Sequence, residues 1–378
     1  MLEKGRISSS QLGVMMFLTM IATVVLTVPS LTGKYAGNDM WLSPIWASGT
    51  GFLTLFIMVG LHRIFPGMSI IQYVEQITGV LIGKGIGILY VCFLIHTTGI
   101  VVRTYSEFIV NAFLDRTPIV VVTGSMLLLT GYAVICGLET ISRLAQFFLP
   151  LFLFPLLFFP LLGKDMEFGN IFPILNDGLI PSIKGAIVPQ AWYSEIFLVN
   201  FLLPFLADPD KALRACVFSI IGMILDLILC CLVVLFIFGR QVTDLIYPVM
   251  YAFGYIRIAD FLENLESLAM MLWVVGAFVK IAVFHYVSIL SISQWLRLSS
   301  YRSVVWPITL FIGLCSMWAI PNQQELLYYT GTTFPILSLI VHVLLPSLLF
   351  GLAWLRFRSR KGTPAAAGHQ NRRFGREG

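Results

Sequence analysis

Residues 180–206 read IPSIKGAIVPQAWYSEIFLVNFLLPFL, and this stretch decides the fold. It is long and apolar enough to cross a bilayer, which takes about 20 mostly apolar residues in a helix. It also contains Pro181, Gly185, Pro189 and Glu195, which are tolerated at lipid depth only where protein or a watery cavity supplies partners. The stretch therefore predicts a membrane-spanning helix that is interrupted inside a bundle of other helices.

The rest of the chain has the same apolar character. Of its 378 residues, 58% are hydrophobic and 11% are charged, whereas a soluble domain carries about a quarter charged residues. The apolar windows are continuous and lack the alternation of barrel strands, so the predicted fold class is an all-α integral membrane protein. The ten predicted spans are residues 11–29, 41–61, 86–113, 119–136, 144–162, 180–206, 212–238, 268–295, 304–320 and 333–355.

Lys and Arg residues indicate which loops face the cytoplasm, because positive charge near helix ends is retained there. With the N-terminus inside, thirteen basic residues lie on the cytoplasmic side, and the six outside are Lys34, Arg116, Lys164, Lys184, Arg240 and Arg257. We therefore expect both termini in the cytoplasm. The net charge of +5 then reflects topology and contact with membrane lipids, and no nucleic-acid partner is expected. Residues 1–356 form the predicted transmembrane domain, and residues 357–378 form a basic, disordered cytoplasmic tail.

A second interruption is predicted in span one. There Ala22 and Thr23 precede the small and hydroxylated run Thr27-Val28-Pro29-Ser30. Spans one and six begin the two halves of a five-plus-five arrangement, and interrupted helices at corresponding positions are typical of inverted-repeat transporters. The alternative is that the prolines of the two spans only end or kink their helices.

Ionisable residues at lipid depth mark the candidate coupling groups. Glu195 in span six is expected to face a cavity or a partner, because an exposed carboxylate there costs several kcal/mol. In span three, Arg103 and Glu107 are four residues apart on one helical face, where they belong to the site or form a structural ion pair. In span eight, Lys280 lies near the midplane, where it belongs to the site or pairs with a carboxylate such as Glu195 or Asp226.

The sequence contains none of the common catalytic or metal-binding motifs. The six cysteines lie in apolar windows without metal-ligand spacing and are expected to be reduced packing residues. We find no HExxH, no phosphate loop and no GxSxG. The sequence therefore predicts a protein that is not an enzyme and that needs no metal or cofactor.

An ordered set of short segments resembles one family over about residues 7–355. The segments are Ile7-Ser8 with Gln11, Val28-Pro29, Ala36-Gly37-Asn38-Asp39-Met40-Trp41, Phe65-Pro66-Gly67-Met68-Ser69, Thr117-Pro118, Gly137-Leu138-Glu139 with Arg143, Asn170-Ile171-Phe172-Pro173 with Gly178, Glu195, Phe205-Leu206, Tyr247-Pro248, and Trp273 with Phe278-Val279-Lys280. With these segments the chain resembles the spore germination permeases, the B subunits of the nutrient germinant receptors of endospore-forming bacteria, in the amino acid, polyamine and organocation transporter superfamily. It departs from the family pattern at Asn264, where an arginine is expected.

The resemblance implies a fold like that of the sodium-coupled leucine transporter, with two inverted repeats and with helices one and six broken. An amino acid would lie between the broken helices, with its carboxylate against the exposed backbone of span one and its side chain under an aromatic residue of span six. The ligand-binding residues that the resemblance implies are Ala22 and Thr23 in span one, Thr98 and Gly99 in span three, Trp192 and Tyr193 in span six, and Ser288 in span eight.

The resemblance also implies a receptor complex in the spore inner membrane, with a larger A subunit and a lipid-anchored C subunit as partners. The chain would then sense a small nutrient, an amino acid, and pass a conformational shift to those partners. The alternative is a proton-coupled amino acid transporter in which Glu195, Glu107 or Lys280 titrates. The residues leave sugars and nucleosides open as ligands.

Overall fold

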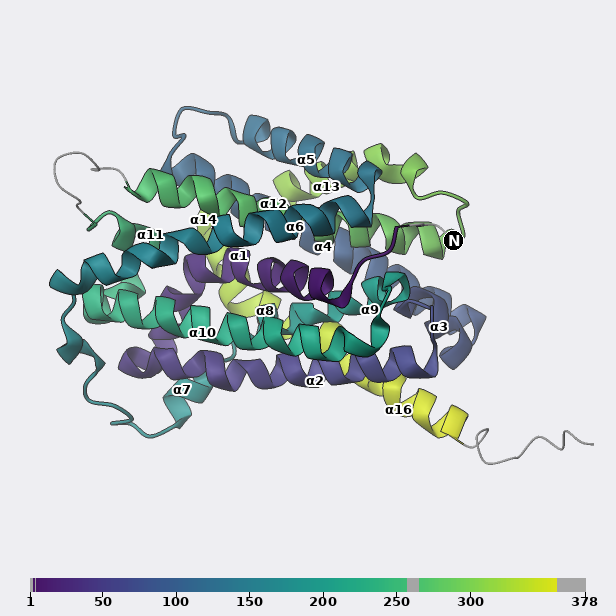
Figure 1. The fold of residues 1–378 in the computed structure, drawn as a ribbon, viewed down its shortest axis with the longest axis horizontal. Helices are drawn as coiled ribbons and strands as arrows, with labels where there is room; N and C mark the ends of the chain where they lie inside the picture. The colour runs from purple at the N-terminus through teal and green to yellow at the C-terminus, as the bar shows by residue number, and fades with distance from the viewer. Residues whose placement is uncertain (1–2, 4, 257–264, 359–378) are drawn as a thin grey trace, which may run out of the picture.

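The fold is described by a computed structural model that covers residue 3, residues 5–256 and residues 265–358. Asn264 and residues 359–378 of the predicted tail lie outside the described residues. In the part described, the chain is a bundle in which most of the long helices run roughly parallel (Figure 1), and β-structure is limited to an isolated bridge between Ile7 and Leu206. The predicted all-α fold is thus confirmed.

The helices follow the chain order of the predicted spans. The first half contains α1 (Ser9–Ala36), η1 (Gly37–Leu42), α2 (Ser43–Ile64), α3 (Ile70–Thr78), α4 (Val80–Ala112), α5 (Ile119–Cys136), α6 (Leu138–Leu153), η2 (Phe154–Lys164) and η3 (Phe168–Ile171). The second half contains α7 (Ile180–Gly185), α8 (Gln190–Ser194), η4 (Glu195–Leu198), α9 (Val199–Leu202), η5 (Leu203–Phe205), η6 (Pro209–Lys211), α10 (Ala212–Phe238), η7 (Gly239–Asp244), α11 (Pro248–Phe253), α12 (Leu265–Trp295), η9 (Arg302–Val304), α13 (Val305–Trp318), α14 (Gln323–Tyr328), η10 (Tyr329–Thr333), α15 (Phe334–Ser338), η11 (Leu339–Leu344) and α16 (Leu345–Arg358).

Seven segments of the described chain are long and apolar enough to cross a membrane, judged by length and composition. One of them, Ser9–Ile64, contains both α1 and α2, and α13 lies in a shorter apolar helix, Arg302–Trp318. The interrupted run from α7 to η5 adds one more. Together these make the ten spans that the sequence predicts.

Span one is a single uninterrupted helix, so the predicted break at Ala22 and Thr23 is wrong for this structure. The helix α1 starts at a capping box, in which the Gln11 backbone N–H donates to Ser8 Oγ at 3.1 Å. It then continues through Pro29. Every residue from 15 to 33 is buried, and α1 packs against α6, α7, α10 and α12. A proline inside a membrane helix is tolerated when neighbouring helices enclose it in this way.

Span six is interrupted, as predicted. The helix stops after Gly185 and resumes at Gln190, and the gap ends with a proline, which cannot donate an N–H. Helix α2 supplies partners for the backbone there: Ser43 Oγ donates to the Ser182 carbonyl at 2.8 Å, and Thr50 Oγ1 donates to the Gln190 carbonyl at 3.3 Å. A side chain at Gly185 would place its Cβ 2.5 Å from Ser43 Oγ, so this close approach requires glycine. Irregular backbone is therefore buried in protein, as the bilayer demands.

Span ten is also irregular, which the sequence analysis did not anticipate. Its helix contains two π-helical segments, η10 and η11, on either side of α15. The irregular region lies against the broken span six: Gln190 Nε2 donates to the Pro335 carbonyl at 2.8 Å, and Ser194 Oγ lies 3.0 Å from His342 Nδ1. Because π-helical turns are frequent at functional sites, this contact indicates a functional site in the middle of the bundle.

At one end of the bundle, α3 packs closely on the start of α4. A Cβ at Gly83 would lie 2.5 Å from the backbone Cα of Glu75, whereas a Cβ at Gly85 would meet nothing within 4 Å. Only the first of these two glycines is therefore required by packing.

Candidate functional site

A buried ion pair lies in the middle of the bundle. Lys280 on α12 donates to both carboxylate oxygens of Glu195 on the broken span six, with Nζ 2.9 Å from Oε1 and 2.7 Å from Oε2. The two side chains are 0% and 1% exposed. Of the two partners that the sequence allowed for Lys280, the structure selects Glu195. A carboxylate and an amine at this depth keep their charges only because each neutralises the other.

A small cavity lies directly against this ion pair. Its volume is about 30 Å³, which is the space of a single water in the liquid. The residues that line it are Thr23, Thr27, Thr97, Ile100, Val101, Thr104, Trp192, Glu195, Tyr247, Lys280, Gln323, Leu326, Leu327, Thr330 and Phe334. Pockets that bind small molecules commonly hold about 300–1,000 Å³. The structure therefore represents a closed state of the central cavity.

The interruption in span six positions an aromatic side chain over the cavity. Trp192 on α8 is 4% exposed, and its Nε1–H donates to Thr23 Oγ1 on α1 at 2.8 Å. Its ring meets the ring of Phe334 edge-on, with centroids 5.5 Å apart. Two of the predicted ligand-binding residues, Trp192 and Thr23, are thus brought together by spans six and one, although α1 is intact.

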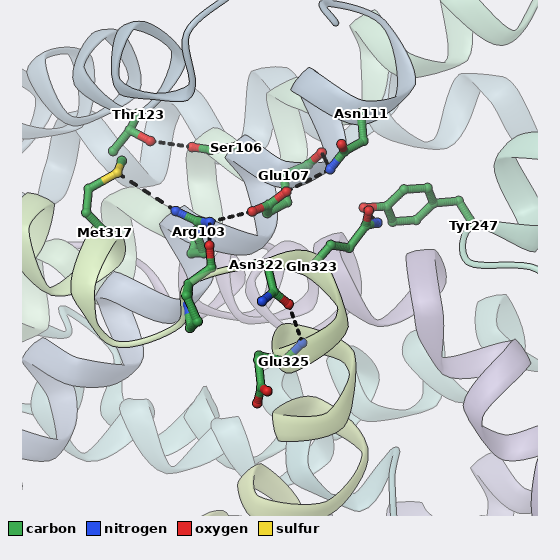
Figure 2. Close-up of polar contacts among 11 residues, drawn as sticks. Arg103, Ser106, Glu107, Asn111, Thr123, Tyr247, Met317, Asn322, Gln323 and Glu325 are labelled. Carbon is green, nitrogen blue, oxygen red and sulfur yellow. Dashed lines mark hydrogen bonds and ion pairs between the residues drawn. The ribbon is translucent and has the colours of Figure 1, made fainter.

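A second ion pair lies next to the cavity on α4, between Arg103 and Glu107, with Arg103 Nη2 2.6 Å from Glu107 Oε1. Neither residue lines the cavity. The same Arg103 atom also donates to the Pro321 carbonyl at 2.9 Å, in the loop between α13 and α14. Figure 2 shows this pair beside Gln323 and Tyr247, which both line the cavity. Gln323 Nε2 donates a hydrogen bond to the Tyr247 hydroxyl at 2.8 Å. Arg103 therefore ties α4 to the entrance of span ten.

The remaining predicted ligand-binding residues lie elsewhere in the bundle. Thr98 Oγ1 and Ser288 Oγ are 2.9 Å apart and join α4 to α12 without reaching the cavity. Gly99 faces α13, where its Cβ would lie 3.1 Å from Cys315 Cβ.

Tyr193 packs on α2, where the Cβ of a residue at Gly51 would lie 3.2 Å from Tyr193 Cβ, and it does not line the cavity. Ala22 is fully buried within α1 and does not line the cavity either. Because the helix continues past Ala22 and Thr23, their backbone N–H groups are bonded within it. The predicted cradle for a carboxylate at this backbone is thus closed in this structure.

Several lining residues were missed by the sequence analysis. They are Thr27, Thr97, Tyr247, Gln323, Thr330 and Phe334. A signal was present for span ten, because Thr330-Gly331-Thr332-Thr333 is small and hydroxylated and is followed by Pro335, the same pattern that drew attention to span one. The side chains of Tyr247 and Gln323 come from connecting segments, for which the apolar periodicity carries no signal.

Outside the spans, the start of the chain is tied to the end of span six. The Ile7 backbone N–H donates to the Phe205 carbonyl at 3.1 Å, and the Ser9 backbone N–H donates to Asp208 Oδ1 at 2.7 Å. The bond from Ser9 holds the pKa of the Asp208 carboxyl below its ordinary value. The first helix of one half is thereby fastened to the first span of the other half.

The site contains charged groups that can bind a charged ligand. Among the described residues there is no group of three or more His, Cys, Asp and Glu side chains placed to hold a metal ion. Among the described residues, the charged groups that line the cavity are one acid, Glu195, and one base, Lys280. When a ligand binds, each of them can leave the other and pair with the group of opposite charge on the ligand.

Two relatives are similar to this chain over nearly its whole length. The spore germination protein KB of Bacillus subtilis (strain 168) is 23% identical over 371 residues, which cover 95% of this chain and 98% of the relative. The spore germination protein A2 of the same organism is 25% identical over 347 residues, covering 90% and 93%.

Solved transporter structures share the fold. Mhp1, a nucleobase-cation-symport-1 family transporter in a closed conformation with bromovinylhydantoin bound, has a TM-score of 0.68 at 12% identity, covering 94% of this chain and 80% of that chain. MhsT in complex with L-phenylalanine has a TM-score of 0.63 at 14% identity, covering 92% and 89%. The likeness confirms an integral membrane protein with a leucine-transporter-like fold of two inverted five-span repeats. A model of the family described as spore germination protein matches residues 6–324, and the chain therefore belongs to that family.

Proposed function

We propose that the chain is the nutrient-sensing subunit of a spore germination receptor and that the central cavity binds the nutrient. The observation that carries the proposal is the buried pair of Glu195 and Lys280 at a closed cavity under Trp192, in a chain of the spore germination family. The A and C subunits of the receptor are the proposed partners. The proposed location is the spore inner membrane, with both termini in the cytoplasm.

The chemistry of the cavity favours an amino acid. An amino acid carries a carboxylate and an ammonium group, and Lys280 and Glu195 offer the two matching charges at the same cavity. The wall beside them is apolar and aromatic, with Ile100, Leu327 and Phe334 among its residues. Such a wall suits a small neutral side chain.

Binding requires the bundle to open, because about 30 Å³ cannot hold an amino acid. A nutrient that fits only the open form shifts the population toward that form, by an amount set by its differential affinity. The proposed signal to the partner subunits is this shift. The hydrogen bond from Arg103 to the Pro321 carbonyl is one contact that opening must break.

Proton-coupled amino acid transport is the second candidate. It is favoured by the same buried acid and base, which lie in a fold that solved transporters share. It is also favoured by the free-energy cost of keeping both groups charged at lipid depth. In this reading, substrate and proton exchange at Glu195 and Lys280 as the cavity opens to one side and then the other.

Two assays separate the candidates. Purified full-length protein in lipid vesicles is given labelled amino acids with and without an imposed proton gradient, and spores that carry or lack the gene are tested on single nutrients. The receptor proposal predicts a lost nutrient response without the gene and no gradient-driven accumulation in vesicles. Accumulation that follows the proton gradient supports the transporter instead.

A conservative variant tests the cavity. Trp192→Phe keeps an aromatic ring and removes the N–H that donates to Thr23 in the closed state. The loss of a hydrogen bond worth about 1 kcal/mol weakens that state, which corresponds to a roughly fivefold lower nutrient concentration for half-maximal germination. The matched control is Trp318→Phe, the same change at a side chain that is 80% exposed. An unchanged response in Trp192→Phe spores with normal protein levels removes Trp192 from the site.

A further inference from the structure

A second cavity, of about 60 Å³, is lined on α1 by Val25 and Leu26, whereas the central cavity is lined there by Thr23 and Thr27. It is enclosed by α1, α4, α6, η2, α10, α11 and α12. Five of its lining side chains are aromatic, namely Phe108, Phe152, Phe159, Phe253 and Trp273. Among the described residues, this cavity and the central cavity share no lining residue.

The cavity contains a buried carboxylate that forms no ion pair with the described residues. Asp226, near the middle of α10, is 7% exposed, and its Oδ1 has no hydrogen-bond partner in the described structure. Its other oxygen is contacted by the thiol of Cys230 at 4.0 Å. Among the described residues that line the cavity, Asp226 is the one that is charged. The buried base Lys280 is already paired with Glu195.

A second polar atom at the same cavity is also unsatisfied. Trp273 on α12 is 8% exposed, and its Nε1–H has no acceptor in the described structure. Its ring meets the ring of Phe108 edge-on with centroids 4.5 Å apart, and the rings of Phe159 and Phe253 lie 5.3 Å apart. Unpartnered buried polar groups cost about 1–3 kcal/mol each, and more when charged. Two of them at one cavity indicate that an occupant completes the structure.

We propose that this cavity is a binding site for a small ammonium-type cation. A carboxylate supplies the counter-charge and hydrogen-bond acceptor that such a cation needs, and aromatic faces attract cations stripped of water. Inorganic cations such as Ca²⁺ or Mg²⁺ prefer six or more oxygen ligands, and the side chains lining this cavity supply only one carboxylate. The chemistry therefore selects an ammonium group.

The volume limits the size of the ligand. A water occupies about 30 Å³ in the liquid, so 60 Å³ holds about two non-hydrogen atoms. Methylammonium fills this space by itself. Ammonium leaves room for one water, which accepts the hydrogen bond from the Trp273 N–H while ammonium donates to Asp226.

Equilibrium dialysis with radiolabelled methylammonium tests the site, using purified full-length protein in lipid nanodiscs. We expect saturable binding of about one equivalent per chain, displaced by ammonium chloride and unaffected by sodium chloride at equal ionic strength. Asp226→Asn removes the charge and is expected to weaken binding by about a hundredfold or more. Asp177→Asn, the same change at an exposed carboxylate, is the matched control and is expected to bind normally.

A second variant keeps the test decisive if Asp226→Asn fails to fold. Ala269→Leu fills the cavity from α12 and leaves the carboxylate in place, so it is expected to abolish binding as well. Unchanged binding in either folded variant overturns the proposal. Displacement by methanol as strong as by ammonium also overturns it, since the cavity then holds neutral molecules or water only. Absence of saturable methylammonium binding to the wild type also overturns the proposal.

Discussion

Removing one partner of the buried ion pair between Glu195 and Lys280 is predicted to destabilise the protein far more than removing both. At 2.7 Å and an effective dielectric constant of about 20, the attraction between the two charges is roughly 6 kcal/mol. Desolvation of two fully buried ions cancels much of this gain. A single variant loses the attraction and keeps a buried charge, which costs about 3–5 kcal/mol.

A double-mutant cycle measures this difference. The variants are Glu195→Gln, Lys280→Met and the two combined, followed by thermal unfolding in detergent. With the unfolding entropy per residue of globular proteins applied to 378 residues, each single variant is expected to lower Tm by about 4–6 °C. The double variant is expected to regain most of that loss, because no uncompensated charge remains. Losses that simply add in the double variant would refute the reasoning, since they would mean that the two groups do not depend on each other.

Three further predictions follow from contacts outside that pair. Arg103→Lys keeps the positive charge and loses the hydrogen bond to the Pro321 carbonyl. We expect this loss to weaken the closed state by about 1.5 kcal/mol and to lower the nutrient threshold for germination roughly tenfold. An unchanged threshold contradicts a role of Arg103 in holding the closed state. Gly83→Ala is expected to destabilise the protein by about 1–3 kcal/mol in thermal unfolding, because its Cβ meets backbone at 2.5 Å, whereas Gly85→Ala, with open space around it, is expected to change little. A backbone N–H of α1 lowers the pKa of Asp208. The stability that this carboxylate contributes is therefore full above its unfolded pKa and is lost as the pH falls through its folded pKa. When Tm is measured down to about pH 3, it is expected to fall less in Asp208→Asn than in the wild type.

Ion-pair partners illustrate what sequence reasoning leaves open. The depth of Glu195 and Lys280 in apolar windows predicts that each needs a partner, because the cost of an isolated charge in lipid does not depend on the rest of the fold. The identity of the partner depends on how α12 lies against span six, 85 residues away in the chain. Within the described structure, the same packing leaves Asp226 Oδ1 without a hydrogen-bond partner, although the sequence also offered Asp226 as a partner of Lys280.

The two predicted helix interruptions also separate what the sequence predicts from what packing decides. Pro189 and Glu195 predict a broken span six because they introduce backbone and charge that lipid cannot satisfy. Pro29 suggests a break of the same kind in span one, yet α1 stays continuous because neighbouring helices enclose it completely. In span ten, the π-helical segments arise where the helix meets Gln190 and Ser194 of span six, a contact that no local pattern reveals.

The sequence by itself determined that this chain crosses a membrane as ten helices, because the apolar content of each window sets its place in the bilayer without reference to the others. It also determined which polar residues demand burial in protein. Only the tertiary structure decided which of these residues meet, that the central cavity is closed around Glu195, Lys280 and Trp192, and that span one remains whole. These outcomes depend on packing between segments distant in the chain, where proximity is set by the bundle and not by spacing in the sequence.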